Sequence, residues 1–276
     1  MTGARYSALF AALEQRGEGA FIPFTMLGDP NLPGSSEILE TLISAGADAL
    51  ELGIPFSDPI ADGPVIQAAA TRALESGLRV EDCWRLIRGA RDRAPELPIG
   101  LLLYANLVVR RGPGRFYREA REAGVDSVLI ADLPVDEAEP FAREAEAAGI
   151  APVMIVPPNA SADRLARIAR ATRGYTYVTT RAGVTGEDAR RYAELEPTLR
   201  SLAALNAPPA VLGFGISGPD QVRAALQAGA VGAISGSGIV RRVAEHAGDG
   251  AGLAIELRRF VGSMKEATRG ALSGSR

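Results

Sequence analysis

The chain has 276 residues, and its 30 basic and 33 acidic side chains give a formal charge of -3. A composition of 47% hydrophobic and 23% charged residues is typical of a globular protein with a sizeable core, which excludes disorder as a description of the whole chain. The small net charge gives no electrostatic basis for binding nucleic acid or an anionic membrane.

The first 16 residues mix charged and apolar side chains at helical spacing, which predicts an extra N-terminal helix. They lack the sustained apolar stretch of a signal peptide, and no later run is long enough to span a bilayer. We therefore expect a cytoplasmic protein that does not enter a membrane.

From residue 20 onward, short apolar runs alternate with amphipathic helical patterns. A joint made of a helical stretch, an Ala-Gly break and an apolar run begins near Ser44, Glu122, Ala147 and Gln227. Glycine in such a joint ends a helix, and a β-rich run follows at once. The predicted strands lie near residues 20–24, 48–52, 98–103, 126–131, 152–156, 175–180, 210–214 and 231–235. The clearest predicted helices cover residues 37–45, 83–93, 114–123, 137–148 and 219–228.

Eight strand–helix units in a chain of this length predict an α/β fold, a single closed (β/α)8 TIM barrel. Most of the strands are continuously apolar, as expected of parallel strands covered on both faces. An open doubly wound sheet is the structural alternative. No linker divides the chain, so we predict one barrel domain over residues 1–266 and a flexible C-terminal tail over 267–276.

Three residue types that often carry chemistry occur only once each, as Cys83, His246 and Lys265. A cysteine-based zinc cluster and a poly-His metal site are thereby excluded, and we expect no metal. Lys265, in a C-terminal helical segment, is a poor candidate for the desolvated lysine of a Schiff-base mechanism. The working acid and base must be sought among carboxylates.

Glu51 lies inside the apolar second strand. Burying a carboxylate there is costly unless it is paired or its pKa rises, and a raised pKa suits a general acid/base. The alternative is that Glu51 points outward and pairs with an arginine of a covering helix. The following loop carries Asp58, which suits a local turn, and Asp62, which the same reasoning makes a second carboxylate over the pocket.

Glycine-rich loops follow the predicted strands six, seven and eight, at residues 181–186, 213–218 and 235–240. Exposed backbone N–H groups beside a helix N-terminus form an anion site without a lysine, although such glycines also serve tight turns. Residues 213–218 fit a dinucleotide fingerprint, but the acidic residue expected about twenty positions later is missing. Tyr104 and Tyr177, in or just after strands, are either barrel packing or pocket wall.

Several motifs, in order along nearly the whole chain, closely resemble the tryptophan synthase α subunit family. They begin at Pro23, Leu50, Leu103, Gly174, Arg181, Gly213 and Ala233, and the stretch from Glu51 to Asp62 is the most specific. The resemblance implies a barrel that cleaves indole-3-glycerol phosphate to indole and glyceraldehyde 3-phosphate, a retro-aldol reaction without metal or cofactor. It also implies that Glu51 is the acid/base and that Asp62 holds the indole N–H.

The same resemblance implies the remaining site residues. It implies that Gly186, Gly215, Gly236 and Ser237 bind the phosphate and that Phe24, Leu102, Tyr177 and Phe214 hold the indole. It also implies that Thr185 belongs to a mobile lid that closes over Asp62. One departure is visible, because Met26 stands where the family usually has a threonine.

The resemblance further implies a partner, a β subunit that uses pyridoxal phosphate and receives indole through a tunnel in an α2β2 complex. Pro55, Asp58 and Asn106 match positions near that contact, and the pyridoxal phosphate belongs to the partner alone. Competing hypotheses are a non-catalytic phosphosugar-binding barrel that acts as an allosteric activator of a partner, and another phosphate-handling barrel enzyme such as an isomerase.

Overall fold

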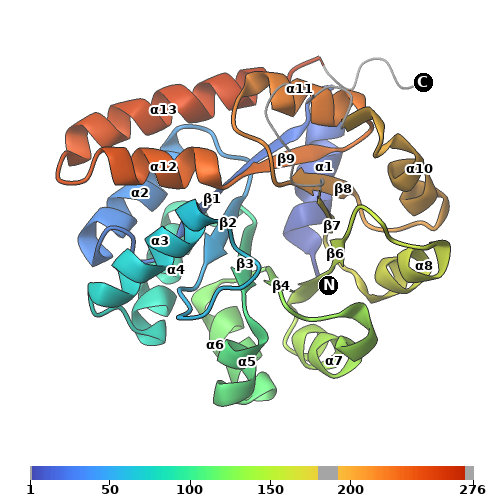
Figure 1. The fold of residues 1–276 in the computed structure, drawn as a ribbon, viewed down its shortest axis with the longest axis horizontal. Helices are drawn as coiled ribbons and strands as arrows, with labels where there is room; N and C mark the ends of the chain where they lie inside the picture. The colour runs from blue at the N-terminus through green and yellow to red at the C-terminus, as the bar shows by residue number, and fades with distance from the viewer. Residues whose placement is uncertain (1, 180–191, 271–276) are drawn as a thin grey trace.

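The computed structural model of the chain describes residues 2–179 and 192–270. Its strands form one all-parallel sheet in the order β5-β4-β3-β2-β1-β9-β8-β7-β6. Helices surround these strands (Figure 1). The strands are β1 Ala20–Met26, β2 Leu50–Gly53, β3 Ile99–Leu103, β4 Ser127–Ile130, β5 Ala151–Val153, β6 Ile155–Val156, β7 Thr176–Thr179, β8 Ala210–Gly213 and β9 Gly232–Ser235.

The sheet closes on itself through its fifth predicted strand. That strand is interrupted at Met154, so that β5 pairs with β4 whereas β6 pairs with β7. Each of the eight predicted strand regions therefore contains strand structure, and the closed (β/α)8 barrel is confirmed. The open doubly wound alternative is wrong, because the two halves of this strand bridge what would be the edges of an open sheet.

The helices follow the predicted pattern, with differences at their starts. They are α1 Ala4–Gln15, α2 Leu32–Ser44, α3 Pro64–Glu75, α4 Val80–Arg93, α5 Ala105–Arg111, α6 Pro113–Ala123, the short η1 Val135–Glu137, α7 Glu139–Ala147, α8 Ala162–Ala171, α10 Glu196–Ala204, α11 Pro219–Gln227, α12 Ser237–Glu245 and α13 Gly250–Glu266. The helix predicted at 37–45 begins at Leu32, because Asn31 caps it and Pro33 sits in the first turn, where proline is tolerated. The helix predicted at 137–148 is divided into η1 and α7.

Alternation along β1 separates the inside of the barrel from its outside. Ile22, Phe24 and Met26 pack in the interior cluster, whereas Phe21 packs in the outer layer between strands and helices. Met26 is thus an interior residue, and Thr25 lies on the opposite face of the strand.

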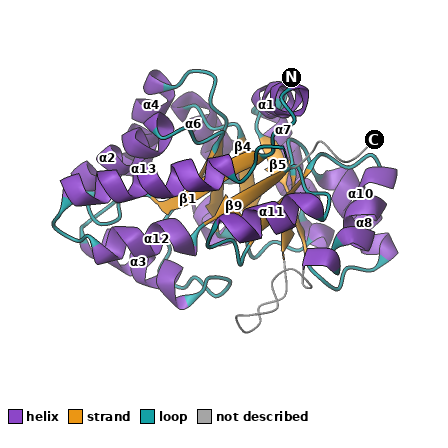
Figure 2. Cartoon of the chain, turned by 90° about the horizontal axis from the view of Figure 1, so that it is seen from above, coloured by secondary structure: helices purple, strands orange, loops and turns teal. Residues whose placement is uncertain are grey.

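The predicted N-terminal helix α1 covers the amino ends of the strands (Figure 2). The Tyr6 hydroxyl is 2.9 Å from Ser127 Oγ, and its ring centroid is 5.1 Å from that of Tyr175. Arg5 forms an ion pair with Asp126. These contacts close the amino end of the barrel and leave its carboxyl end for a site.

Ordered packing at the C-terminus continues past residue 266, where the sequence places the start of the tail. Ala267 and Thr268 are buried, and the Thr268 carbonyl accepts a hydrogen bond from Gly19 N. The first residues of the predicted tail are therefore part of the packed structure, and 271–276 lie outside the described residues. No helix in residues 2–179 and 192–270 combines the length and apolar character required to cross a bilayer.

Candidate active site

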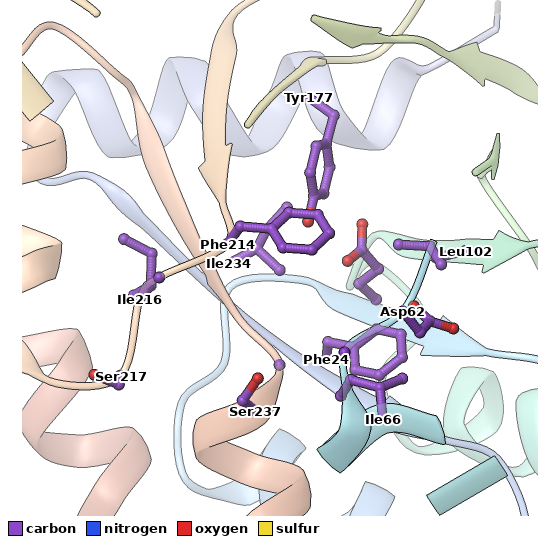
Figure 3. Close-up of a pocket in the computed structure, with 14 residues that line it drawn as sticks. Phe24, Asp62, Ile66, Leu102, Tyr177, Phe214, Ile216, Ser217, Ile234 and Ser237 are labelled. Carbon is purple, nitrogen blue, oxygen red and sulfur yellow. The ribbon is translucent and has the colours of Figure 1, made fainter. Parts of the chain in front are cut away.

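A pocket opens at the carboxyl ends of the strands, and Figure 3 shows most of its side chains pointing toward one another. Strand ends and the loops and helices that follow them supply its walls. It is lined by Phe24, Glu51, Asp62, Gly63, Ile66, Leu102, Tyr177, Phe214, Gly215, Ile216, Ser217, Ile234, Gly236 and Ser237. All nine of the predicted catalytic and substrate-binding residues that the structure describes are in this set, whereas Thr185 and Gly186 lie outside the described residues.

Glu51 points into the barrel and is only 1% exposed. The Tyr175 hydroxyl donates a hydrogen bond of 2.9 Å to Glu51 Oε1, and Oε2 is buried without a hydrogen-bond partner among the described residues. Burial raises the pKa of Glu51 from 4.5 to about 7, although the Tyr175 hydrogen bond opposes the rise. The outward-pointing alternative is wrong, and near neutral pH this carboxyl group can both give and take a proton.

This pKa predicts that stability depends on pH through Glu51. Between pH 4.5 and about 7 the folded protein keeps a proton on Glu51 that the unfolded chain has lost. The stability that this proton contributes is therefore complete below pH 4.5 and is lost as the pH rises through about 7. The loss is roughly 3 kcal/mol at about 1.4 kcal/mol per pH unit. Urea unfolding at about pH 5 and about pH 8 checks it, and Glu51→Gln should reduce the decline. An equal decline in both proteins would contradict the prediction.

Asp62 lies on the loop between β2 and α3 and lines the same pocket as Glu51. The Gln67 side-chain amide donates a 2.8 Å hydrogen bond to the Asp62 carbonyl. Partial burial raises the pKa of the Asp62 carboxyl, and a hydrogen bond with the Tyr104 hydroxyl opposes that rise. Glu51 and Asp62 therefore occupy different environments in one pocket, which allows the two carboxyl groups to take different roles.

The same pocket contains an apolar slot formed by Phe24, Leu102, Tyr177 and Phe214. Phe24 and Leu102 lie close to Asp62 in Figure 3, and Tyr177 and Phe214 meet edge to face with centroids 6.2 Å apart. Phe214 has a φ of 69° and is 47% exposed, an unusual backbone for a bulky residue, of the kind found at functional sites. A Cβ on Gly213 would lie 2.0 Å from the Tyr177 hydroxyl, so glycine is required there for Tyr177 to hold its place.

The other end of the pocket is built from backbone. Gly215, Gly236 and Ser237 line it, and α12 begins at Ser237. The buried Ser235 hydroxyl donates a 2.7 Å hydrogen bond to the Ile216 carbonyl, which fixes the neighbouring loop. No lysine or arginine is among the described residues that line the pocket, so an anion here would be held by amide N–H groups, a serine hydroxyl and the helix N-terminus.

Five lining residues were not predicted: Gly63, Ile66, Ile216, Ser217 and Ile234. Ile234 could have been predicted, because side chains alternate between the two faces of a strand and Ile234 therefore faces the opposite side from Ala233 and Ser235. Ile66 could not, because α3 was not among the predicted helices. Of the expected partner contacts, Asp58 and Asn106 are exposed at this end of the barrel, whereas Pro55 is buried.

Cys83, His246 and Lys265, each the single residue of its type in the sequence, lie outside the pocket. Lys265 forms ion pairs of 3.1 Å with Glu18 and 3.0 Å with Asp48 at the amino end of the barrel. Burial raises the pKa of the Cys83 thiol to about 12. Within the described ranges, no three His, Cys, Asp or Glu side chains are grouped in a way that could hold a metal ion.

Comparisons with known proteins agree with this picture. The family model for the tryptophan synthase alpha chain matches residues 10–269. The alpha chain of Shewanella oneidensis is 54% identical over 265 residues, which are 96% of this chain and 95% of the relative. That of Escherichia coli O17:K52:H18 is 51% identical over 265 residues, with 96% and 99% covered.

Solved structures show the same similarity. The tryptophan synthase subunit alpha of Legionella pneumophila matches with a TM-score of 0.86 at 29% identity, over 96% of this chain and 98% of that one. A chain of the tryptophan synthase complex from Pyrococcus furiosus matches with a TM-score of 0.80 at 32% identity, over 90% and 98%.

The closed barrel and its pocket at the carboxyl ends of the strands define a TIM-barrel protein of the kind that acts as an enzyme. More narrowly, the chain belongs to the tryptophan synthase alpha chain family. That membership makes it a lyase in general terms, of tryptophan biosynthesis.

Proposed function

We propose that the chain cleaves indole-3-glycerol phosphate to indole and glyceraldehyde 3-phosphate by a retro-aldol reaction. The observation that carries the proposal is the pocket itself. A buried acid, Glu51, a second carboxyl group, Asp62, an apolar slot and an amide-lined anion site occur together at the carboxyl end of a barrel. Each part matches one portion of this substrate.

Glu51 serves as the acid and then as the base. Protonated Glu51 gives its proton to C3 of the indole ring, and the resulting carboxylate takes the proton of the hydroxyl on the adjoining glycerol carbon. The bond between C3 and that carbon then breaks, the hydroxyl becomes the aldehyde, and Glu51 ends protonated as it began. A pKa of about 7 suits both steps, since neither protonation state is far out of reach at neutral pH.

Asp62 stabilises the charge that develops between these steps. Protonation at C3 leaves the indole nitrogen cationic, and an anionic carboxylate that accepts the ring N–H lowers the energy of that form. Phe24, Leu102, Tyr177 and Phe214 would hold the flat indole, and Gly215, Gly236 and Ser237 the phosphate. The carbon–carbon cleavage needs only proton transfers and charge stabilisation from these residues, so in this proposal the chain itself carries no cofactor. We also propose that it works in the cytoplasm.

The partner in this proposal is a β subunit that receives the indole and holds pyridoxal phosphate, in an α2β2 complex. The Pyrococcus furiosus relative is described as a complex. At the pocket end of this chain, Ile60 is 83% exposed on the loop after β2 and Val109 is 56% exposed on α5, with Asp58 and Asn106 nearby in the sequence. Exposed apolar side chains rimmed by polar ones are typical of an interface.

The test is an indole-release assay with purified chain and indole-3-glycerol phosphate, run with and without a β subunit. We expect indole and glyceraldehyde 3-phosphate in a one-to-one ratio, and faster release with the partner present. Absence of product in both arms would disprove the lyase. Substrate binding and stimulation of the partner without indole release would favour the phosphosugar-binding activator, and another product would favour an isomerase.

A further inference from the structure

Tyr104 is a buried tyrosine beside the pocket with no part in the reaction as proposed so far. It follows the last residue of β3 directly, is buried, and is not among the residues that line the pocket. A buried tyrosine hydroxyl needs hydrogen-bond partners, so what this hydroxyl contacts indicates what the residue does.

The Tyr104 hydroxyl contacts the loop that carries Asp62. It accepts a hydrogen bond of 3.0 Å from the backbone N–H of Ala61, the residue before Asp62. The hydroxyl also interacts with the Asp62 carboxyl group closely enough to lower the pKa of that group. One side-chain oxygen thus holds the backbone beside Asp62 and interacts with the carboxyl group itself.

The Tyr104 ring contacts the same loop at its other end. It stacks on Phe56 with the ring centroids 5.2 Å apart and the planes at 25°. Between Phe56 and Ala61 the loop is largely open to solvent, with Ser57, Asp58 and Ile60 exposed. A loop with so little burial of its own depends on such anchors for a defined position, because ordering it costs conformational entropy.

We propose that Tyr104 is the positioning residue that holds Asp62 over the pocket in the orientation that faces the indole nitrogen. It acts through Asp62 and does not touch the substrate, so it is not a catalytic residue. This inference rests on the proposed function, since it concerns a role of Asp62 in that reaction. A displacement of a catalytic group by about 1 Å can cost as much as roughly a hundredfold in rate, so a positioning residue has a measurable effect.

Tyr104→Phe tests the proposal because it keeps the ring and its stacking on Phe56 and removes only the hydroxyl. We expect kcat/KM for indole release to fall roughly tenfold or more, with the thermal midpoint close to that of the wild type. Tyr117→Phe is the matched control, since Tyr117 is a buried tyrosine of the outer helix α6, and it should keep wild-type activity.

Two further readouts separate positioning from a merely structural role. In the Asp62→Asn background the same substitution should cost less than roughly threefold, because the residue acts through the group already changed. The acid limb of the kcat/KM profile should also move to higher pH, because the variant loses the Tyr104 hydroxyl, which lowers the pKa of Asp62. The other titratable groups near this pair, Glu51 on β2, Tyr177 on β7 and Asp132 after β4, are unchanged in the variant.

The outcomes distinguish this inference from the proposed function. If wild type and Tyr117→Phe release indole and Tyr104→Phe matches them, the positioning role is overturned and the lyase stands. Equal losses in the wild-type and Asp62→Asn backgrounds, or an unmoved acid limb, overturn it as well. If the wild-type chain itself releases no indole, the proposed function fails and this inference fails with it.

Discussion

Glu51→Gln is expected to reduce kcat for indole release by about a thousandfold or more, within the range that general acid/base groups contribute. Glutamine has nearly the same shape and still accepts the Tyr175 hydrogen bond, but it cannot transfer a proton. The variant should bind substrate with an affinity near that of wild type, because the indole slot and the anion site are unchanged. Steady-state assays of indole release, with binding measured by calorimetry, check both parts.

The stability of this variant guards against a trivial explanation. Above neutral pH, removing this ionisable group from its buried position should leave the thermal midpoint unchanged or raise it, because the folded protein then has no charge to bury there. Glu40→Gln on α2 is the control, because the Glu40 side chain is 61% exposed and its ion pair with Arg93 is worth little. Near-full turnover in Glu51→Gln would remove the proposed acid/base role.

The placement of Glu51 shows why much of the site could be predicted from sequence. Its carboxyl lies in an apolar strand next to Phe24 of β1 in the sheet register, and a closed barrel turns alternate residues of each strand inward. The glycine loops after β8 and β9 were predictable for a similar reason, since the carboxyl ends of parallel strands meet on one face. For residues such as these, the local sequence pattern and the fold class together are enough to predict a place in the site.

The residues that position the carboxyl groups were not predictable in the same way. The tyrosine that bonds Glu51 is 124 positions away, and the one that bonds Ala61 is 43 positions away. Nothing in the local sequence distinguishes Tyr175 or Tyr104 from an ordinary core aromatic. Only the three-dimensional register of β2, β3 and β7 shows which hydroxyl reaches which carboxyl group.

Asp62→Asn is expected to reduce kcat by about a hundredfold, a typical cost of removing one group that stabilises transition-state charge. The amide oxygen of asparagine still accepts the indole N–H, so ground-state binding and KM should change by less than roughly threefold. What is lost is the negative charge, which matters only once protonation at C3 has made the ring cationic. A loss confined to kcat is the signature of an interaction made mainly in the transition state.

The pH profile gives Asp62→Asn a second test. Burial raises the pKa of the Asp62 carboxyl, so wild-type activity should fall on the acid side as this group becomes protonated. That limb should be absent in the variant, whereas in Tyr104→Phe it should persist at higher pH. Asp136→Asn is the control, because Asp136 forms a half-exposed ion pair with Arg167 outside the pocket. This variant should keep the wild-type kcat and the acid limb of the pH profile. An Asp62→Asn variant that raises KM and leaves kcat unchanged would show that Asp62 contributes to binding alone.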